Sequence, residues 1–276
     1  MRMVLKDGKR KVLTLSYDDG VVQDKRLVKI LDKYGIKCTF NINSGKYCPE
    51  PNDGVRGRMT KTSAIQLFKD SGHEVAIHSY SHQFLERLSA AEVIYEITED
   101  KRNIEKDFGI IARGMAYPFG SYNDVVVDIL CKCGIEYCRT TKSTESFKFP
   151  ENWLTLNPTC HHNNKRLMEL AGLFAEKENR WKQAEMFYLW GHSFEFDDND
   201  NWNVIENFSE YIGNRDNIWY ATNIEVYDYV AAYKRLQVSY DKSIVHNPTS
   251  VDVWFDLENE TYCVKAGKTI NVNQEV

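Results

Sequence analysis

The chain has 276 residues, of which 42% are hydrophobic and 27% are charged. This length and balance suit one large α/β domain with room for an appendage, and they exclude a mini-protein. Its 35 basic and 40 acidic residues give a formal net charge of −5 with no long basic run, so nucleic acid is not expected as a partner, and no apolar stretch is long enough to span a bilayer.

Strand-like and helix-like segments alternate along the chain. Hydrophobic spacing predicts seven strands, at 12–17, 37–43, 74–78, 114–117, 136–140, 185–190 and 219–222. Helical spacing and end signals predict helices at 23–34, 62–70, 90–108, 122–133, 165–175, 204–212 and 225–236. Repeated alternation of this kind indicates parallel strands joined by helices, and a seven-stranded barrel-like sheet is the simplest closure. The alternative is an open doubly wound sheet, although no glycine-rich phosphate loop follows the first strand.

The C-terminal segment has a different pattern. From Ser243 onward, alternating residues and turn signals replace the helical period. We therefore divide the chain into a barrel at residues 1–236 and a small β-rich extension at residues 237–276.

The N-terminal residues and the cysteines bear on the cellular location. The opening MRMVLKDGKRKV has no apolar core of the kind found in signal peptides. Seven cysteines, an odd number, favour free thiols in a reducing compartment. We therefore expect a cytoplasmic protein, or an extracellular one only if a leader precedes this sequence.

Polar side chains follow several of the predicted strands. In a parallel barrel the active site forms at the carboxyl ends of the strands. The residues found there are Asp18, Asp19, His78, His82, the segment 117–120, Arg139, His192 and Asn223, with Asn43 as a weaker candidate. These side chains are expected to meet at one rim.

Two histidines and two aspartates in this set have the spacing of a metal site. His78 and His82 are four residues apart, so a helical turn would place both rings on one face. One of Asp18 and Asp19 can supply a third ligand, and the other can act as a general base. Alone, DDG is usually a turn, HxxxH is usually a solvated pair and a single histidine such as His192 is usually hydrogen-bonded. Their occurrence at three strand ends favours a common site.

Three motifs resemble a known family. The sequences SYDDG at 16–20, HSYSH at 78–82 and LWGH at 189–192 are similar to motifs of the NodB-type polysaccharide deacetylases, carbohydrate esterase family 4. The resemblance covers roughly residues 11–233. It implies a distorted (β/α)7 barrel, which with the C-terminal segment gives an α/β fold with a small β appendage.

The resemblance also implies roles for individual residues. Asp19, His78 and His82 would hold one divalent metal ion, usually Zn²⁺. Asp18 would be the base that activates water, and His192 would be the acid that protonates the leaving nitrogen. The backbone N–H of Phe119 would complete an oxyanion hole.

Two family features are absent from this sequence. Ala116 stands where the family usually has an arginine that orients the base, and we hypothesise that Arg139 supplies that guanidinium instead; a structural arginine is the alternative. The family's fourth motif is not recognisable, so no carboxylate partner of His192 can be named. Glu195 is close in sequence but is expected to point away.

Other residues are candidates for contact with substrate. They are Tyr117, Trp190 and His161, together with His162, Trp153 and Trp202. The two histidines can equally cap the following helix, and the aromatic residues can equally be core.

The sequence therefore predicts a metal-dependent hydrolase that removes acetyl groups from an N-acetylated sugar or oligosaccharide. Cleavage of an O-acetyl ester or a small amide by the same site is an alternative. A carbohydrate-binding protein with a decayed site is another.

Overall fold

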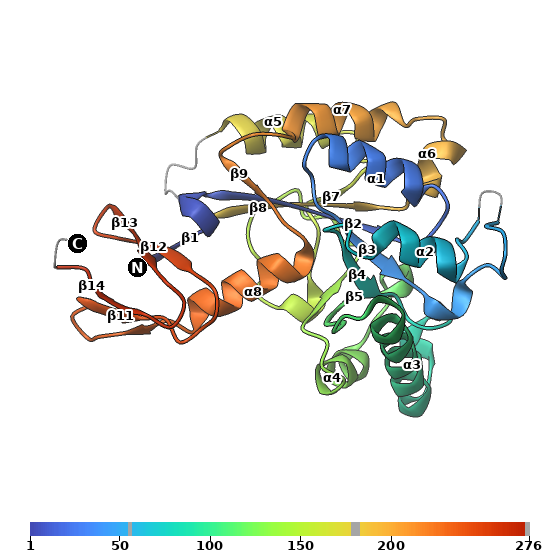
Figure 1. Cartoon of the computed structure of the whole chain (residues 1–276), viewed down its shortest axis with the longest axis horizontal. Helices are drawn as coiled ribbons and strands as arrows, with labels where there is room; N and C mark the ends of the chain where they lie inside the picture. The colour runs from blue at the N-terminus through green and yellow to red at the C-terminus, as the bar shows by residue number, and fades with distance from the viewer. Residues whose placement is uncertain (55–56, 178–182, 274–276) are drawn as a thin grey trace.

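The structure is a computed structural model that describes residues 1–54, 57–177 and 183–273. Its centre is a curled parallel sheet that forms a half-barrel with the helices around it (Figure 1). The strands are β2 (Lys11–Asp18), β3 (Thr39–Ile42), β4 (Glu74–Ile77), β5 (Gly114–Ala116), β6 (Tyr137–Arg139), β7 (Cys160–His161), β8 (Glu185–Gly191) and β9 (Ile218–Tyr220). Their order is β6-β5-β4-β3-β2-β8-β7, with β9 also paired to β2.

Helices pack around the outside of this curled sheet. They are α1 (Asp24–Lys33), α2 (Lys61–Phe68), α3 (Ala90–Phe108), α4 (Asp124–Lys132), α5 (Leu167–Glu176), α6 (Phe194–Asp198), α7 (Asn203–Ile212) and α8 (Asn223–Lys234). Helices α1, α5 and α7 lie together at the top of the view, and α3 and α4 lie together below (Figure 1). One set of β2 side chains packs on these helices and the other set packs inside the half-barrel, so every residue of β2 is buried, as is typical of a central parallel strand.

The sheet differs in two details from the seven strands expected. Within the described residues it has eight strands, because the two-residue strand β7 pairs with β8. Two residues are too few to show a period in the sequence. In addition, β9 and β3 share one edge of β2: β9 pairs with Lys11–Leu13, and β3 pairs with Ser16–Asp18. This shared edge distorts the barrel.

The C-terminal segment forms two small antiparallel sheets. It contains β10 (Gln237–Val238), β11 (Ile244–His246), β12 (Val253–Leu257), β13 (Glu260–Val264) and β14 (Thr269–Asn271). The N-terminal strand β1 (Arg2–Val4) pairs with β12, so the two ends of the chain meet. The division at residues 236 and 237 stays a prediction, and this pairing crosses it. Strand β1 has only three residues, so its sequence shows no strand pattern from which this pairing could be predicted.

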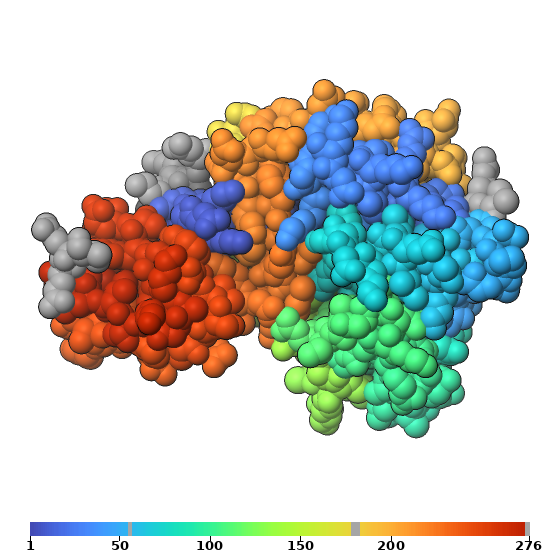
Figure 2. Space-filling view, in the orientation of Figure 1, coloured from blue at the N-terminus to red at the C-terminus, as the bar shows by residue number. Residues whose placement is uncertain are grey.

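The extension forms a separate lobe at one end of the molecule. Figure 2 shows the C-terminal residues as one mass, with the N-terminal residues against it. Val245, Val253, Phe255 and Val264 form its buried centre together with Ala232 of α8. In the described residues no helix is both long enough and apolar enough to cross a bilayer.

Candidate active site

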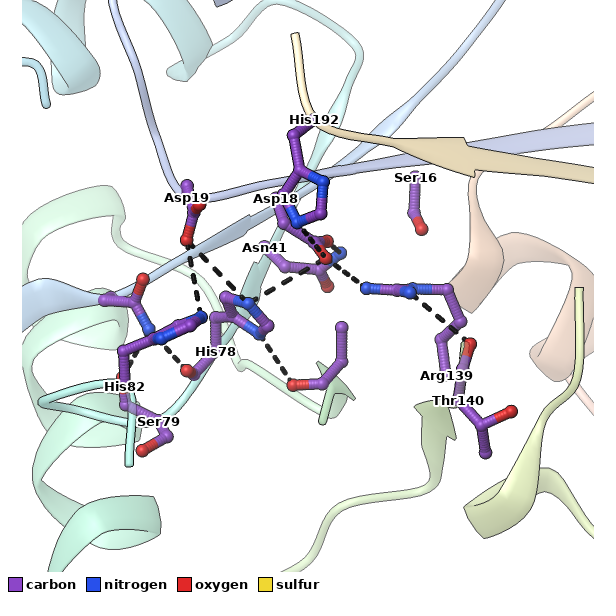
Figure 3. A network of polar contacts seen from close by, with 12 residues as sticks. Ser16, Asp18, Asp19, Asn41, His78, Ser79, His82, Arg139, Thr140 and His192 are labelled. Carbon is purple, nitrogen blue, oxygen red and sulfur yellow. Dashed lines mark hydrogen bonds and ion pairs between the residues drawn. The ribbon is translucent and has the colours of Figure 1, made fainter. Parts of the chain in front are cut away.

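The predicted ligands Asp19, His78 and His82 lie together at the carboxyl edge of the sheet (Figure 3). Asp19 Oδ1 is 3.6 Å from His82 Nε2 and 3.9 Å from His78 Nε2. His78 Nδ1 is 2.7 Å from the carbonyl oxygen of Ala116, so we assign the ring proton to Nδ1 and the free electron pair to Nε2. One carboxylate and two imidazoles are a donor set that suits a divalent metal such as zinc, and three protein ligands leave a position open.

The loop that carries the two histidines is irregular. The expectation of a helical turn after β4 was wrong, because Ser79 and His82 have φ values of 67° and 60°, in the left-handed region. Two buried carboxylates of α3 hold this backbone: Asp100 accepts from His78 N at 2.9 Å, and Glu96 accepts from Ser79 Oγ at 2.6 Å. The rings of His78 and His82 still lie only 4.8 Å apart.

Asn43 belongs to the same support. Its side-chain amide donates to the carbonyl oxygens of His78 and Ser79, the latter at 2.7 Å. Asn43 is therefore a structural residue of the rim.

Asp18 is buried, with 2% of its surface exposed. Arg139 Nη2 donates to Asp18 Oδ2, and Asn41 Nδ2 donates to Oδ1 at 2.8 Å. Burial alone would raise the pKa of Asp18, but Arg139, His78, His192 and Asn41 together lower it to about 2. The carboxylate is therefore ionised at neutral pH.

Arg139 lies where the sequence hypothesis requires it. The guanidinium is buried, contacts Asp18 and lies 4.2 Å from the ring centre of Trp190. Trp190 is buried and packs against this guanidinium. The stacking of its ring holds the arginine in place.

His192 faces Asp18 from β8. Its Nε2 lies 3.8 Å from Asp18 Oδ2, and its Nδ1 lies 2.7 Å from Glu195 Oε1. Burial lowers the pKa of His192, but Glu195, Asp18 and Asp19 outweigh it and hold the pKa above its ordinary value. The protonated ring, an acid, is thereby favoured.

The expectation that Glu195 points away was wrong. The backbone turns at the start of α6, where Glu195 N donates to His192 O at 3.2 Å, and this turn brings the two side chains together. Glu195 is thus the carboxylate that the sequence could not name. The three-residue spacing of a histidine and a glutamate at the start of a helix was the available signal.

His161 and His162 lie on the other side of Glu195. Their Nε2 atoms are 3.4 and 3.0 Å from Glu195 Oε2. Neither caps α5, whose N-cap residue is Arg166, so that alternative is wrong. Burial lowers the pKa of His162 to about 4 despite the nearby carboxylate.

The aromatic candidates divide between the rim and the core. Phe119 is 54% exposed, and its ring stacks on Phe84 at 3.9 Å and meets His82 at 4.5 Å, so it lies at the mouth of the site. Tyr117 is buried with its hydroxyl donating to Leu154 O, which places it in the core and not against substrate. Trp153 and Trp202 are buried as well.

Asn223 does not reach the rim. Because β9 pairs with the first residues of β2, the side chain of Asn223 meets Thr14 and Tyr188 at 2.7 and 2.6 Å inside the fold. The prediction that Asn223 lies among the site residues was therefore wrong.

Residues 5–138 match the family model described as polysaccharide deacetylase. The match to this family thus covers just under half of the chain. It is 31% identical over 122 residues to peptidoglycan-N-acetylmuramic acid deacetylase PdaC of Bacillus subtilis, which covers 43% of this chain and 23% of that protein. It is 28% identical over 127 residues to chitin deacetylase 1 of Cryptococcus neoformans, covering 46% and 25%. The matches thus span about a quarter of these relatives.

Solved structures confirm the fold of the chain. A putative polysaccharide deacetylase from Mycobacterium smegmatis aligns with a TM-score of 0.59 and 16% identity, over 85% of this chain and 95% of that one. A family 4 carbohydrate esterase from Streptomyces lividans aligns with a TM-score of 0.51 and 17% identity, over 74% and 88%. The distorted barrel expected from the resemblance is therefore confirmed.

Two supporting residues of the candidate active site were missed in the sequence analysis. Asn41 holds Asp18, and Arg58 donates to Asp19 Oδ1 at 2.8 Å and to Asn43 Oδ1 at 2.7 Å. Asn41 is one polar residue inside a buried strand, and Arg58 is in a loop. Neither position carries a periodic signal, so only the folded chain reveals them.

Proposed function

We propose that this chain is a metal-dependent hydrolase that removes acetyl groups from N-acetylated sugars. One observation carries the proposal: the ionised Asp18 lies between an acid, His192, and the ligand set Asp19, His78 and His82. The polymers named for the relatives, chitin and peptidoglycan, contain N-acetylated sugars, and this supports the substrate class.

The ligand set fits a divalent ion, for which zinc is the first candidate. When bound by Asp19, His78 and His82, such an ion would polarise the acetyl carbonyl and make a water molecule more acidic. Metal dependence and the identity of the ion are part of the proposal.

The remaining steps belong to the side chains. Asp18, oriented by Arg139 and Asn41, accepts a proton from the attacking water. The Phe119 N–H donates to the oxygen that becomes negative. His192, held by Glu195 through Nδ1, donates its Nε2 proton to the leaving nitrogen as the C–N bond breaks. Water and amide thus become acetate and amine, with the protons in balance.

We also propose a cytoplasmic location. All seven cysteines are free thiols, which supports a reducing compartment. A small, lipid-linked or imported acetylated sugar would then be the substrate.

The substrate class can be tested by acetate release from N-acetylglucosamine oligomers and from an O-acetyl ester. Wild type is expected to cleave the amide, and Asp18→Asn is expected to lose this activity. Asp128→Asn, on the exposed side of α4, is the matched control and should keep it. Cleavage of the ester alone would make the protein an esterase. Sugar binding without cleavage of either would favour a binding protein.

A further inference from the structure

A second group of potential metal ligands lies beside His192. We propose that His161, His162 and Glu195 form a second divalent-cation site, separate from Asp19, His78 and His82. His161 comes from β7, His162 follows it, and Glu195 comes from α6. One ligand atom of each lies within 4.8 Å of the other two, the same criterion that the first group meets.

The separations fit a single small ion. Glu195 Oε2 is 3.0 Å from His162 Nε2 and 3.4 Å from His161 Nε2. Tetrahedral zinc with bonds of about 2.0–2.2 Å has neighbouring ligand atoms roughly 3.3 Å apart. Both distances lie within about 0.3 Å of that value, whereas one of the two distances in the first group, 3.9 Å, is about 0.6 Å longer.

The burial and orientation of His162 point to a ligand. Its side chain has 0% exposure, yet neither ring nitrogen has a hydrogen-bond partner among the described residues. Nε2 lies 3.0 Å from Glu195 Oε2, but the two atoms do not have the geometry of a hydrogen bond. Because buried polar atoms are normally paired, an unpaired nitrogen beside a carboxylate indicates a missing third partner. A cation between the two atoms would satisfy both.

The ring of His162 is held rigidly in this orientation. It stacks on Phe196 at 4.2 Å and on Tyr17 at 5.7 Å between ring centres. Gly191 makes room for it, since a Cβ at that position would lie 2.0 Å from His162 Nδ1. The ligand is therefore preorganised, and a side chain at residue 191 would displace it.

The donor set selects the class of ion. Two imidazoles and one carboxylate favour zinc, cobalt or nickel over magnesium and calcium, which prefer oxygen. The side chains of His161 and Glu195 are 22% and 21% exposed, so an ion can enter from the rim. Glu195 Oε1 stays on His192, and the ion therefore shares this carboxylate with the acid of the proposed reaction.

Binding requires one local change at His161. Asn163 N donates to His161 Nδ1 at 3.2 Å, so in the metal-free ring the proton is on Nε2. Coordination through Nε2 moves the proton to Nδ1 and breaks this exposed bond. A metal–nitrogen bond is much stronger than the hydrogen bond it replaces.

The test is a count of bound metal in the whole chain. Protein stripped with a chelator is titrated with Co²⁺, and bound cobalt is measured by mass spectrometry and by its visible absorption. Wild type is expected to bind two equivalents, and Glu195→Gln and His161→Asn are each expected to bind one. Asp19→Asn is expected to keep the second equivalent. His246→Asn, at a partly exposed histidine in the C-terminal sheets, is the control and should bind two.

The outcomes separate this site from the proposed catalytic one. One equivalent in wild type that disappears in Asp19→Asn and survives in Glu195→Gln would overturn the second site and leave the proposed function standing. One equivalent that disappears in Glu195→Gln and survives in Asp19→Asn would support the second site against the first. Replacing His162 would disturb its buried stacking on Phe196, so the test uses variants of the partly exposed residues His161 and Glu195 instead.

Discussion

Arg139 illustrates how a residue far away in sequence completes the environment of Asp18. It comes from β6, four strands along the sheet order from β2, and its guanidinium contacts both Asp18 and the ring of Trp190. The planar guanidinium of arginine stacks on aromatic rings and donates hydrogen bonds in fixed directions. Lysine keeps the positive charge but lacks both properties. The role of Arg139 as the group that orients the base can thus be separated from simple charge neutralisation.

We predict that Arg139→Lys lowers kcat for deacetylation by about 10- to 100-fold with a smaller change in KM, because Asp18 keeps a positive neighbour but loses its fixed orientation. Steady-state kinetics on N-acetylglucosamine oligomers measure this. Arg102→Lys, on the exposed face of α3, is the control. An unchanged kcat in a folded Arg139→Lys protein would show that the arginine is only structural.

At the scale of elements, end signals and periods account for what the sequence could predict. Helix α3 was predicted at its observed bounds because Ser89 and Glu92 form a capping box and Gly109 ends the helix in the left-handed conformation. Strand β7 and helix α6 were missed, since two and five residues show no period. The motifs located the rim, but Asn41, Arg58 and Glu195 act through contacts that only the folded chain brings together.

One partly buried carboxylate, that of Glu74, joins several elements and makes their stability depend on pH. Glu74 of β4 accepts from Tyr137 Oη at 2.7 Å, from Thr39 Oγ1 at 2.8 Å and from Ile224 N, at the start of α8, at 3.0 Å. Burial raises its pKa to about 7, and these hydrogen bonds oppose the effect only in part.

The direction of this pH dependence follows from the difference between the pKa of Glu74 in the folded and in the unfolded chain. Unfolded Glu74 would lose its proton near its ordinary pKa of 4.5, whereas the folded group keeps it to about 7. The group's contribution is therefore fully present below pH 4.5 and is lost as the pH rises through 7. A pKa difference of about 2.5 corresponds to about 3 kcal/mol at most.

We predict that Glu74→Gln, which resembles the protonated acid, becomes more stable relative to wild type as the pH rises from 5 to 8. Urea unfolding at both pH values measures the free energy of unfolding. Glu99→Gln, at a surface ion pair of α3, should show no such change. An equal difference between Glu74→Gln and wild type at both pH values would contradict the raised pKa.

For the whole molecule, the C-terminal lobe is tied to the barrel through α8 and β1. Tyr229 Oη donates to Val4 O at 2.6 Å and accepts from Trp254 N at 3.0 Å. A single buried hydroxyl therefore links the helix to both chain ends, and the lobe should unfold together with the barrel.

We predict that Tyr229→Phe lowers the free energy of unfolding by about 1–3 kcal/mol, because it leaves a buried carbonyl and a partly buried N–H without this partner. Chemical denaturation followed by fluorescence measures the loss. Tyr240→Phe, at a fully exposed position, should have no effect. A Tyr229→Phe protein as stable as wild type would mean that the lobe is not coupled through this residue.

The most direct test of the account is the removal and return of metal. Acetate release from N-acetylglucosamine oligomers is measured before chelation, after chelation and after addition of zinc, with metal content determined at each step. We predict that activity is lost with the metal and restored by zinc in wild type, and that zinc does not restore it in Asp19→Asn. Full activity in metal-free protein, or equal restoration in Asp19→Asn, would contradict the assignment of Asp19, His78 and His82 as the catalytic metal ligands.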